Sequence, residues 1–259
     1  MARMALRRWT SMASVVATAA LVAACSQTGL VTEPTEAESL DPVQLQFRPV
    51  VAAVAISSPA GGALGEATAT NLDQVWEKVG DEAAELASNL TTVPQTEADL
   101  ATLAPFAQLA PSEVALLPTS VRLFVPTIGC DQLTTDAEYF EPSTETVVCD
   151  FEDGNPTEKL HLGPVELDGS HVTGAESATS QVQPGAWVVT VTFTDEGTAA
   201  FADLTAEYIN GRVAVVLATE VITAPTIIST ITNGVVEISG LSGEGEAVEL
   251  ARAINSATE

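Results

Sequence analysis

Residues Trp187 to Gly240 read WVVTVTFTDEGTAAFADLTAEYINGRVAVVLATEVITAPTIISTITNGVVEISG, and this stretch decides the fold. Its first part, Val188–Thr194, alternates apolar residues with threonine, which is the pattern of a half-buried strand. A helix is predicted over Asp195–Ile209, with Asp195 as its N-cap, because a carboxylate accepts the free N–H groups of a first helical turn. The region therefore begins as a strand followed by a helix.

Two further strands and a second helix are predicted after this unit. Val213–Leu217 is a short continuous apolar run, typical of a buried strand, and Val235–Ser239 is bounded by glycines. Glu244–Asn255 has small and apolar residues on one helical face. We expect an α+β fold in which the three strands share one mixed sheet and both helices pack on one face of it.

The N-terminal half is predicted to contain shorter elements. A helix is indicated by apolar residues at helical spacing after a capping Asn71, namely Leu72, Val75, Trp76 and Val79. Trp76 fits either core packing or contact with a partner. A weaker helical pattern runs over residues 96–109 and is broken by Pro105, and residues 121–125 predict a strand.

The first 25 residues predict export and lipidation. A basic start precedes a short apolar run that ends in Leu-Val-Ala-Ala-Cys25, the pattern of a bacterial lipobox. This pattern predicts that residues 1–24 are a lipoprotein signal peptide and that the Cys25 thiol carries a diacylglyceryl group, with palmitate as its acyl chain. An ordinary signal peptide and a short membrane anchor remain as alternatives. We expect an extracytoplasmic protein held at the cell membrane through its lipid alone.

Composition divides the remaining chain into an acidic tether, residues 25–41, and one domain, residues 42–259. The formal net charge of the whole sequence is −26. Removal of the signal peptide would take away basic residues and no acidic ones, so the mature charge is about −29. Such a chain lacks the basic surface that nucleic acids require, so no nucleic-acid partner is expected. The sequence leaves the oligomeric state open.

Cys130 and Cys149 are the two cysteines that remain when Cys25 is lipidated. An even pair in an exported protein predicts a disulfide, which would close a loop of about 20 residues and contribute roughly 3 kcal/mol. The alternative, a metal-binding pair, lacks histidines at ligand spacing. The acidic run Asp150–Pro156 does not have the spacing of a calcium loop and predicts a hairpin turn. We expect no metal site and no cofactor.

No catalytic constellation is recognised. The two histidines, His161 and His171, lie close together in the sequence, but no nucleophile elbow, phosphate loop or zinc-protease motif accompanies them. Gly169-Ser170-His171 is interpreted as a turn rather than as part of a serine hydrolase site. With so many acidic residues, carboxylate pairs arise by chance and indicate no glycosidase. The sequence therefore predicts a protein that is not an enzyme.

Several motifs, in order along the chain, resemble the head of the first extracytoplasmic (P1) domain of SecD, a membrane subunit of bacterial protein export. The actinobacterial form of this family is similar at four places, VQLQFRPV (43–50), LAPSEVALLP (109–118), VPTIGCDQL (125–133) and KLHLGPV (159–165). The family's strand AIVLDG, followed by SAP, is similar to residues 214–219 and 223–225 here, and its final ISG is similar to residues 238–240. The family usually has Asp-Gly where this chain has Ala218-Thr219, so we expect that connection to be altered.

The resemblance covers the head alone. We find no counterpart of the family's ferredoxin-like base, and no run after the last helix reaches the roughly 18–20 apolar residues of a membrane span. The resemblance thus implies a stand-alone head, without the ion-driven membrane bundle of SecD. It implies contact with secretory polypeptides or Sec translocase subunits.

Two functions remain open at the level of sequence. The first is a polypeptide-binding or export-accessory module. The second is a cell-envelope scaffold or small-ligand-binding lipoprotein that reuses the head fold. For the first, an extended apolar segment around Pro225 is the candidate contact, although each of its residues also fits core packing. The candidate binding residues are Val221, Ile222, Ala224, Pro225, Ile227 and Ile228.

Overall fold

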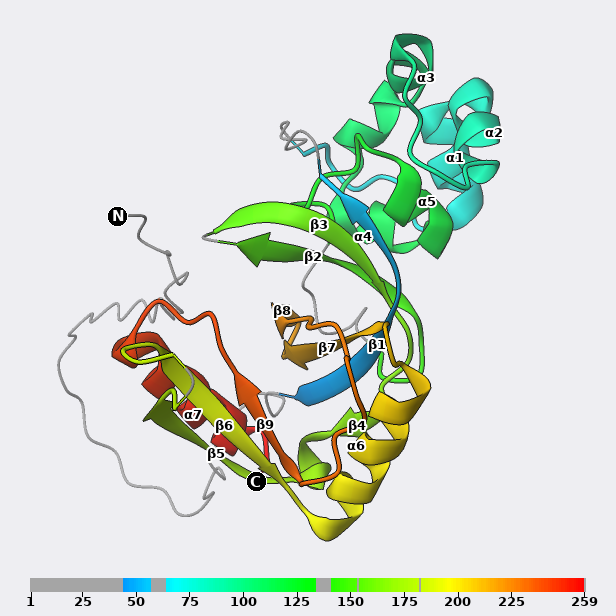
Figure 1. Ribbon diagram of the computed structural model, residues 1–259. Helices are drawn as coiled ribbons and strands as arrows, with labels where there is room; N and C mark the ends of the chain where they lie inside the picture. Colours follow the sequence, from blue (N-terminus) through cyan, green and yellow to red (C-terminus); the bar gives the residue numbers. More distant parts are fainter. Residues whose placement is uncertain (1–43, 57–63, 134–140, 153, 182, 259) are drawn as a thin grey trace, which may run out of the picture.

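A computed structural model describes residues 44–56, 64–133, 141–152, 154–181 and 183–258. The predicted signal peptide, the predicted tether and Cys25, the predicted lipidation site, lie outside the described residues. Within them, the chain folds into two antiparallel sheets and a group of short helices, so the predicted α+β class is confirmed. The strands divide between two sheets instead of sharing the single mixed sheet that was expected (Figure 1).

The larger sheet is built around β1 (Leu45–Ala55), which pairs with β3 on one side and β7 on the other. Its order is β2-β3-β1-β7-β8, and β4 pairs with the start of β1. The two outer strands of this order, β2 and β8, lie next to each other, so the sheet curls strongly. The other strands are β2 (Thr146–Glu152), β3 (Asn155–Leu162), β4 (Leu167–Asp168), β7 (Arg212–Leu217) and β8 (Glu220–Thr223).

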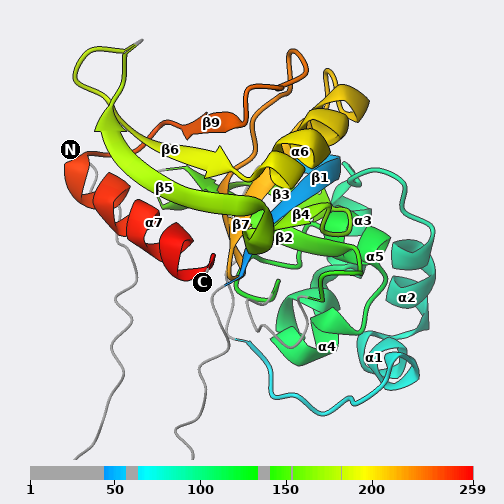
Figure 2. The ribbon, with the colours of Figure 1, turned by 90° about the horizontal axis from the view of Figure 1, so that it is seen from below.

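The smaller sheet has the order β5-β6-β9 and packs against two long helices (Figure 2). Its strands are β5 (Val172–Thr179), β6 (Trp187–Phe193) and β9 (Val235–Ile238). The helices are α6 (Asp195–Glu207) and α7 (Glu244–Ser256), and the 3-10 turn η3 (Gly169–His171) precedes β5. Phe201 of α6 stacks on Phe193 at 4.6 Å and meets Phe47 of β1 edge-on at 5.6 Å between ring centroids. These aromatic rings lie in one core that joins the two sheets.

Short helices form the end of the molecule beyond β2 and β3 (Figure 1). They enclose a second core that includes Val75, Phe106, Val121 and Ile128. The elements are α1 (Leu72–Val79), α2 (Asp81–Ser88), α3 (Glu97–Thr102), the 3-10 helix η1 (Ala104–Gln108), α4 (Pro111–Ala115) and α5 (Thr119–Phe124). Asn71 caps α1 by accepting from the Gln74 N–H, as predicted.

The prediction that Val213–Leu217 joins the sheet of Val188–Thr194 and Val235–Ser239 is wrong. The last two segments do pair, as β6 and β9, whereas the first is β7 in the larger sheet. Both faces of β7 are buried: Val213 and Val215 contribute to the core between the sheets, and Ala214 and Val216 contribute to a third core inside the curl. A continuous apolar run reports such two-sided burial but does not identify the neighbouring strands.

Two local predictions also need correction. Residues 121–125 lie in helix α5 and at its C-terminal end, because Pro118 precedes a helical turn and Lys159 donates to the carbonyl oxygens of Arg122 and Val125 at 3.1 and 2.8 Å. The N-cap of α6 is Thr194, whose hydroxyl accepts from the Gly197 N–H at 2.9 Å; Asp195 is the first helical residue.

Glu113 is a fully buried carboxylate that joins α4 to the segment before α1. It forms a salt bridge of 2.7 Å with Lys78 and accepts from the backbone N–H groups of Thr68, Ala69 and Ala110 at 2.9 Å each. Burial alone would raise its pKa. The bonds from Lys78 and the three backbone amides outweigh burial and lower the pKa from 4.5 to about 2.

The low pKa of Glu113 predicts a specific dependence of stability on pH. Its folded-state value lies below the unfolded-state value, so the ionised group stabilises the fold fully above about pH 4.5 and loses this effect as pH falls towards 2. Glu113→Gln is expected to lower the free energy of unfolding by roughly 3 kcal/mol at pH 7, with a shrinking difference below pH 4.5. Urea titration at several pH values measures this, and Glu85→Gln, at an exposed position of α2, is the control. A difference that does not change with pH would contradict the prediction.

The turn between β7 and β8 contains a strained residue. Ala218 has φ 56°, a left-handed conformation that glycine adopts freely and alanine adopts at a cost of about 1–2 kcal/mol. The turn stays closed because the Ala218 N–H also donates to the Gln44 carbonyl at 2.8 Å. Leu217 pairs with Glu220, so Ala218-Thr219 forms a two-residue turn between β7 and β8 without an Asp-Gly pair.

Ala218→Gly is expected to stabilise the protein by up to about 1 kcal/mol, because the relieved strain exceeds the extra backbone entropy of glycine in the unfolded chain. Ala199→Gly, at an exposed helical position of α6, should instead destabilise it by about 1 kcal/mol. Thermal and urea unfolding of both variants provide the measurement. Destabilisation by both changes would show that the turn does not strain Ala218.

Candidate functional site

The candidate binding segment begins in β8 and continues as a strap over the surface to Ile231. Two of its side chains, Val221 and Ala224, pack in the core inside the curled sheet. Ile222 and Ile227 pack in the core between the sheets. Pro225 is exposed, and Ile228 is 86% exposed, which makes it the most exposed large hydrophobic residue that the structure describes. Four of the six predicted residues therefore pack in a core, and the other two, Pro225 and Ile228, are exposed.

Backbone hydrogen bonds fix the strap against the loop between α6 and β7. The Ile227 N–H donates to the Gly211 carbonyl, and its own carbonyl accepts from the Asn210 N–H, both at 2.8 Å. The Ile231 N–H donates to the Thr205 hydroxyl of α6 at 3.0 Å. These bonds bring Ile228 close to the loop that carries Ile209, which is 45% exposed. Ile209 and Ile228 are thus exposed next to residues whose backbones are hydrogen-bonded to each other.

Arg212 ties this strap to the far side of the larger sheet. Its Nε donates to the Ala224 carbonyl at 2.8 Å, and its two other nitrogens pair with Glu158 of β3 and, at 3.6 Å, with Asp150 of β2. Burial raises the pKa of Asp150, and the positive charge of Arg212 partly opposes this shift. The cluster fastens β2 and β3 to β7 where the sheet curls. We interpret the cluster as structural, because the charge of Arg212 is paired with the carboxylates of Asp150 and Glu158.

The histidines do not form a catalytic relay. The Ser170 hydroxyl and the His171 Nδ1 both bond to the same carboxylate oxygen of Asp168, at 2.5 and 3.0 Å. Asp168 is the N-cap of η3, and the hydroxyl of Ser170, followed by His171, lowers its pKa. His161 of β3 pairs with Glu145, the residue just before β2, at 2.9 Å. A serine nucleophile needs a histidine that accepts its proton and a separate carboxylate behind that histidine, which this shared arrangement does not supply.

The predicted disulfide between Cys130 and Cys149 is present, with 5.8 Å between the two Cα atoms. It joins the chain that follows α5 to strand β2, and so links the helical end of the molecule to the larger sheet. Among the residues that the structure describes, no group of three or more His, Cys, Asp or Glu side chains could hold a metal ion. Asp150–Pro156 forms the β2–β3 hairpin, as predicted, apart from Asp153, which is not described.

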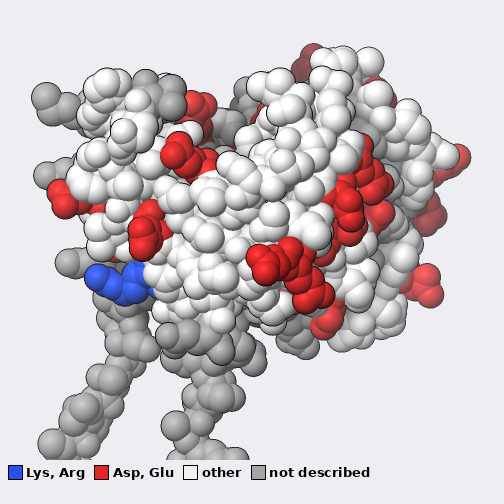
Figure 3. Space-filling model, turned by 60° about the horizontal axis from the view of Figure 1, so that its bottom comes forward, with Lys and Arg blue, Asp and Glu red and all other residues white. Residues whose placement is uncertain are grey.

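Charge on the surface is almost entirely acidic. Figure 3 shows acidic side chains spread over one face and basic ones at a single edge of it. Most basic residues in the described ranges are engaged: Arg48 and Lys159 are buried, Lys78 pairs with Glu113, and Arg212 pairs as above. Burial lowers the pKa of Lys159 to about 7. Within the same ranges, no helix is both long enough and apolar enough to cross a membrane.

The site lies within a region that matches a known family. Residues 145–258 match the family described as SecDF, P1 head subdomain. The chain is 32% identical over 120 residues to the protein translocase subunit SecD of Streptomyces coelicolor, covering 44% of this chain and 21% of that protein. It is 38% identical over 140 residues to SecD of Acetobacter pasteurianus, covering 53% of this chain and 26% of that protein.

Two further similarities complete the comparison. The protein translocase subunit SecDF of Thermus thermophilus is 40% identical over 95 residues, which cover 37% of this chain and 13% of that protein. A solved structure of SecDF, described as a membrane component that enhances protein export, aligns with a TM-score of 0.39 at 24% identity, covering 83% of this chain and 63% of that chain.

The chain spans only 13% to 26% of the length of these three relatives. The matched region begins just before β2 and contains both strap and smaller sheet, whereas β1 and the helices α1 to α5 precede it. The candidate site therefore lies within residues 145–258, the region that matches the SecDF P1 head subdomain.

Proposed function

We propose that this protein is a lipid-anchored, extracytoplasmic export accessory that binds polypeptide and catalyses no reaction. The observation that carries the proposal is the strap around Pro225, which lies inside the SecDF P1 head match and holds Ile228 in water on a fixed backbone. An apolar side chain that is exposed and cannot turn inward gains free energy when a partner covers it. The partners we propose are secretory polypeptides or Sec translocase subunits.

The structure favours a polypeptide over a small ligand as the partner. Small-molecule sites are enclosed and bury most of their ligand. Of two hollows in the described part of the chain, one is open and the other has a volume of only about 10 Å³. The envelope-scaffold alternative shares the lipid anchor and the fold, and it differs in predicting no capture of unfolded chains.

Lipidation of Cys25 is part of the proposal, and its test is direct. Cys25→Ala removes the thiol that accepts the lipid, so the protein is expected to leave the membrane fraction or to persist as uncleaved precursor. Fractionation and labelling with a palmitate analogue measure both outcomes, with Ser26→Ala as the matched control. Normal processing and full membrane retention of Cys25→Ala would rule out the anchor.

Ile228→Asp is expected to reduce capture of an unfolded secretory polypeptide by about tenfold or more, because one large apolar side chain contributes roughly 1.5–3 kcal/mol when covered. Its melting temperature should stay unchanged, since the side chain is 86% exposed. Ser229→Asp adds the same charge at the next exposed position and serves as the control. Pro225→Asp, also exposed, should weaken capture more than it lowers stability.

Capture is measured with one purified, denatured secretory protein at a range of concentrations. Equal capture by the wild type and Ile228→Asp would remove the strap from the binding surface. Absence of capture by the wild type would refute polypeptide binding and leave the scaffold.

A further inference from the structure

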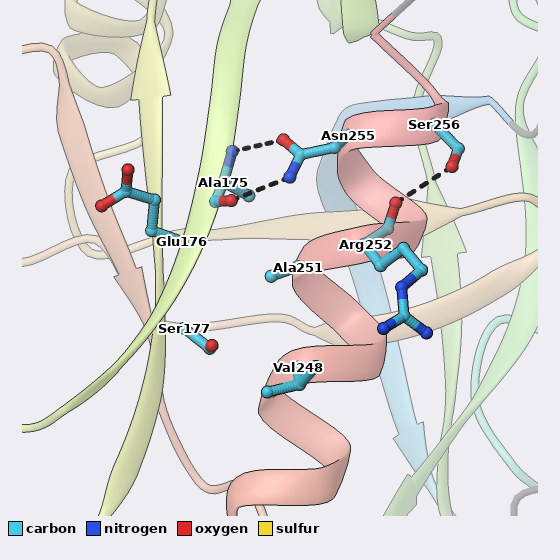
Figure 4. A pocket seen from close by; sticks show the side chains of 8 residues that line it. All are labelled: Ala175, Glu176, Ser177, Val248, Ala251, Arg252, Asn255 and Ser256. Atoms are coloured by element: carbon cyan, nitrogen blue, oxygen red, sulfur yellow. Dashed lines mark hydrogen bonds between the residues drawn. The ribbon is translucent and has the colours of Figure 1, made fainter.

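Strand β5 is an outer strand of the smaller sheet, and its edge away from β6 is partly open. In an antiparallel pair, successive residues direct their N–H and C=O groups alternately to the neighbouring strand and away from it. Ala175 directs both groups away from β6, because they bond to the side-chain amide of Asn255 in α7 at 2.7 and 2.9 Å (Figure 4). Ser180 directs its N–H the other way, to the Ala186 carbonyl at the β6 end of the pair.

This alternation fixes the direction of the next backbone groups. Ser177 and Thr179 lie two and four residues beyond Ala175 in the same regular ladder with β6, so their N–H and C=O groups also point outward. In the described ranges, no hydrogen bond to these outward backbone groups is found. Thr179 is exposed, and the strand has no proline or lysine of the kind that blocks additions to a sheet edge.

An open hollow of about 640 Å³ lies beside this edge. Ala175, Glu176 and Ser177 line it on the strand side, and one face of α7 lines it on the other. Val248 and Ala251 project from α7 towards β5 in Figure 4, while the Asn255 amide spans the gap at one end. That amide occupies the place that the first peptide group of an added strand would take. The Asn255 amide therefore makes the first pair of hydrogen bonds along this edge, and the hollow lies beside the next residues of β5.

We propose that the edge of β5 at Ser177–Thr179 binds an extended polypeptide segment as an added strand, with α7 as the second wall of the groove. Only extended backbone matches donors and acceptors at the spacing of alternate strand residues. This inference rests on the proposed function, for which it supplies a second contact and the conformation of the bound chain.

The negative charge of this chain favours another polypeptide over a second copy of the chain at the edge of β5. A second copy of this strongly acidic chain would bring its own negative charge, including its own Glu176, to the same edge, so pairing of two β5 strands is opposed. A neutral or basic segment from another polypeptide meets no such repulsion. The hollow is also too open to enclose a small ligand.

The first test changes only the ligand. The probe is a synthetic ten-residue peptide of alternating threonine and valine with a lysine at each end, and its binding to the wild-type protein is measured by fluorescence anisotropy. Two N-methylated forms block the amides of one or the other alternate set. Because an added strand donates through one set only, methylation of that set should weaken binding by about tenfold or more, and methylation of the other set should not.

The second test changes the protein. Ser177→Pro removes an outward N–H without removing a bond to β6, so the strand should persist while peptide affinity falls by about tenfold. Ser177→Thr keeps the N–H and is the matched control. Melting curves establish that both variants fold, and the methylated peptides decide the question if Ser177→Pro does not.

The outcomes separate this site from the proposed function. Equal weakening by both methylated peptides, or unchanged affinity of folded Ser177→Pro, would overturn the edge site even if the wild type captures polypeptide. Failure of the wild type to bind either the peptide or an unfolded secretory protein would refute the proposed function itself. A wild-type dimer that Ser177→Pro abolishes would identify a second copy as the occupant and overturn the choice made here.

Discussion

The pairing of β1 with β7 is the constraint on which the rest of the structure depends. The two strands form the wall between two hydrophobic cores, since alternate residues of β7 face the space inside the curled sheet and the space between the two sheets. Phe47 of β1 meets the phenylalanines of β6 and α6 on one side of this wall. The smaller sheet is thus positioned by packing against β1 and β7, without a strand pairing to either. A polar substitution in β7 would expose one core or the other to a charge or an unpaired hydrogen-bonding group.

Sequence alone predicted the type and extent of β6, α6, β7, β9 and α7, but it could not assign the neighbours of every strand. Val188–Thr194 and Val235–Ser239 were correctly joined in one sheet, and the helices begin and end within two residues of the expected positions. The error over Val213–Leu217 arose because periodicity records how many faces of a strand are buried, whereas sheet membership is decided by contacts between distant segments. The error over residues 121–125 has a similar origin: a short apolar run fits a strand or a helix, and Lys159, more than thirty residues away, satisfies the end of the helix.

The candidate surface shows the same limit at the level of single side chains. The composition of the strap predicted an apolar segment around Pro225, and the structure places one there. Which of its residues face water follows from bonds made by Gly211, Asn210 and Thr205, and no local pattern contains that information. The edge of β5 carried no sequence signal either, because its open groups belong to the backbone. Asn255 was the one available clue, as an amide near the end of an otherwise apolar helical face.

The disulfide has a consequence for how this molecule can vary. Cys130 and Cys149 are 19 residues apart in the sequence, and their Cα atoms are held 5.8 Å apart, so the two ends of the chain between them are fixed close together. Closing a flexible loop becomes only about 0.6 kcal/mol more costly with each doubling of its length, and here a covalent bond already fixes the closure. Leu133 and Val147, which lie between the cysteines, belong to the core of the helical end, so an insertion should be tolerated best where it leaves both of them in place. Ser143, an exposed residue between the cysteines, is a position at which an experimenter can place a label without altering the strap or the edge of β5.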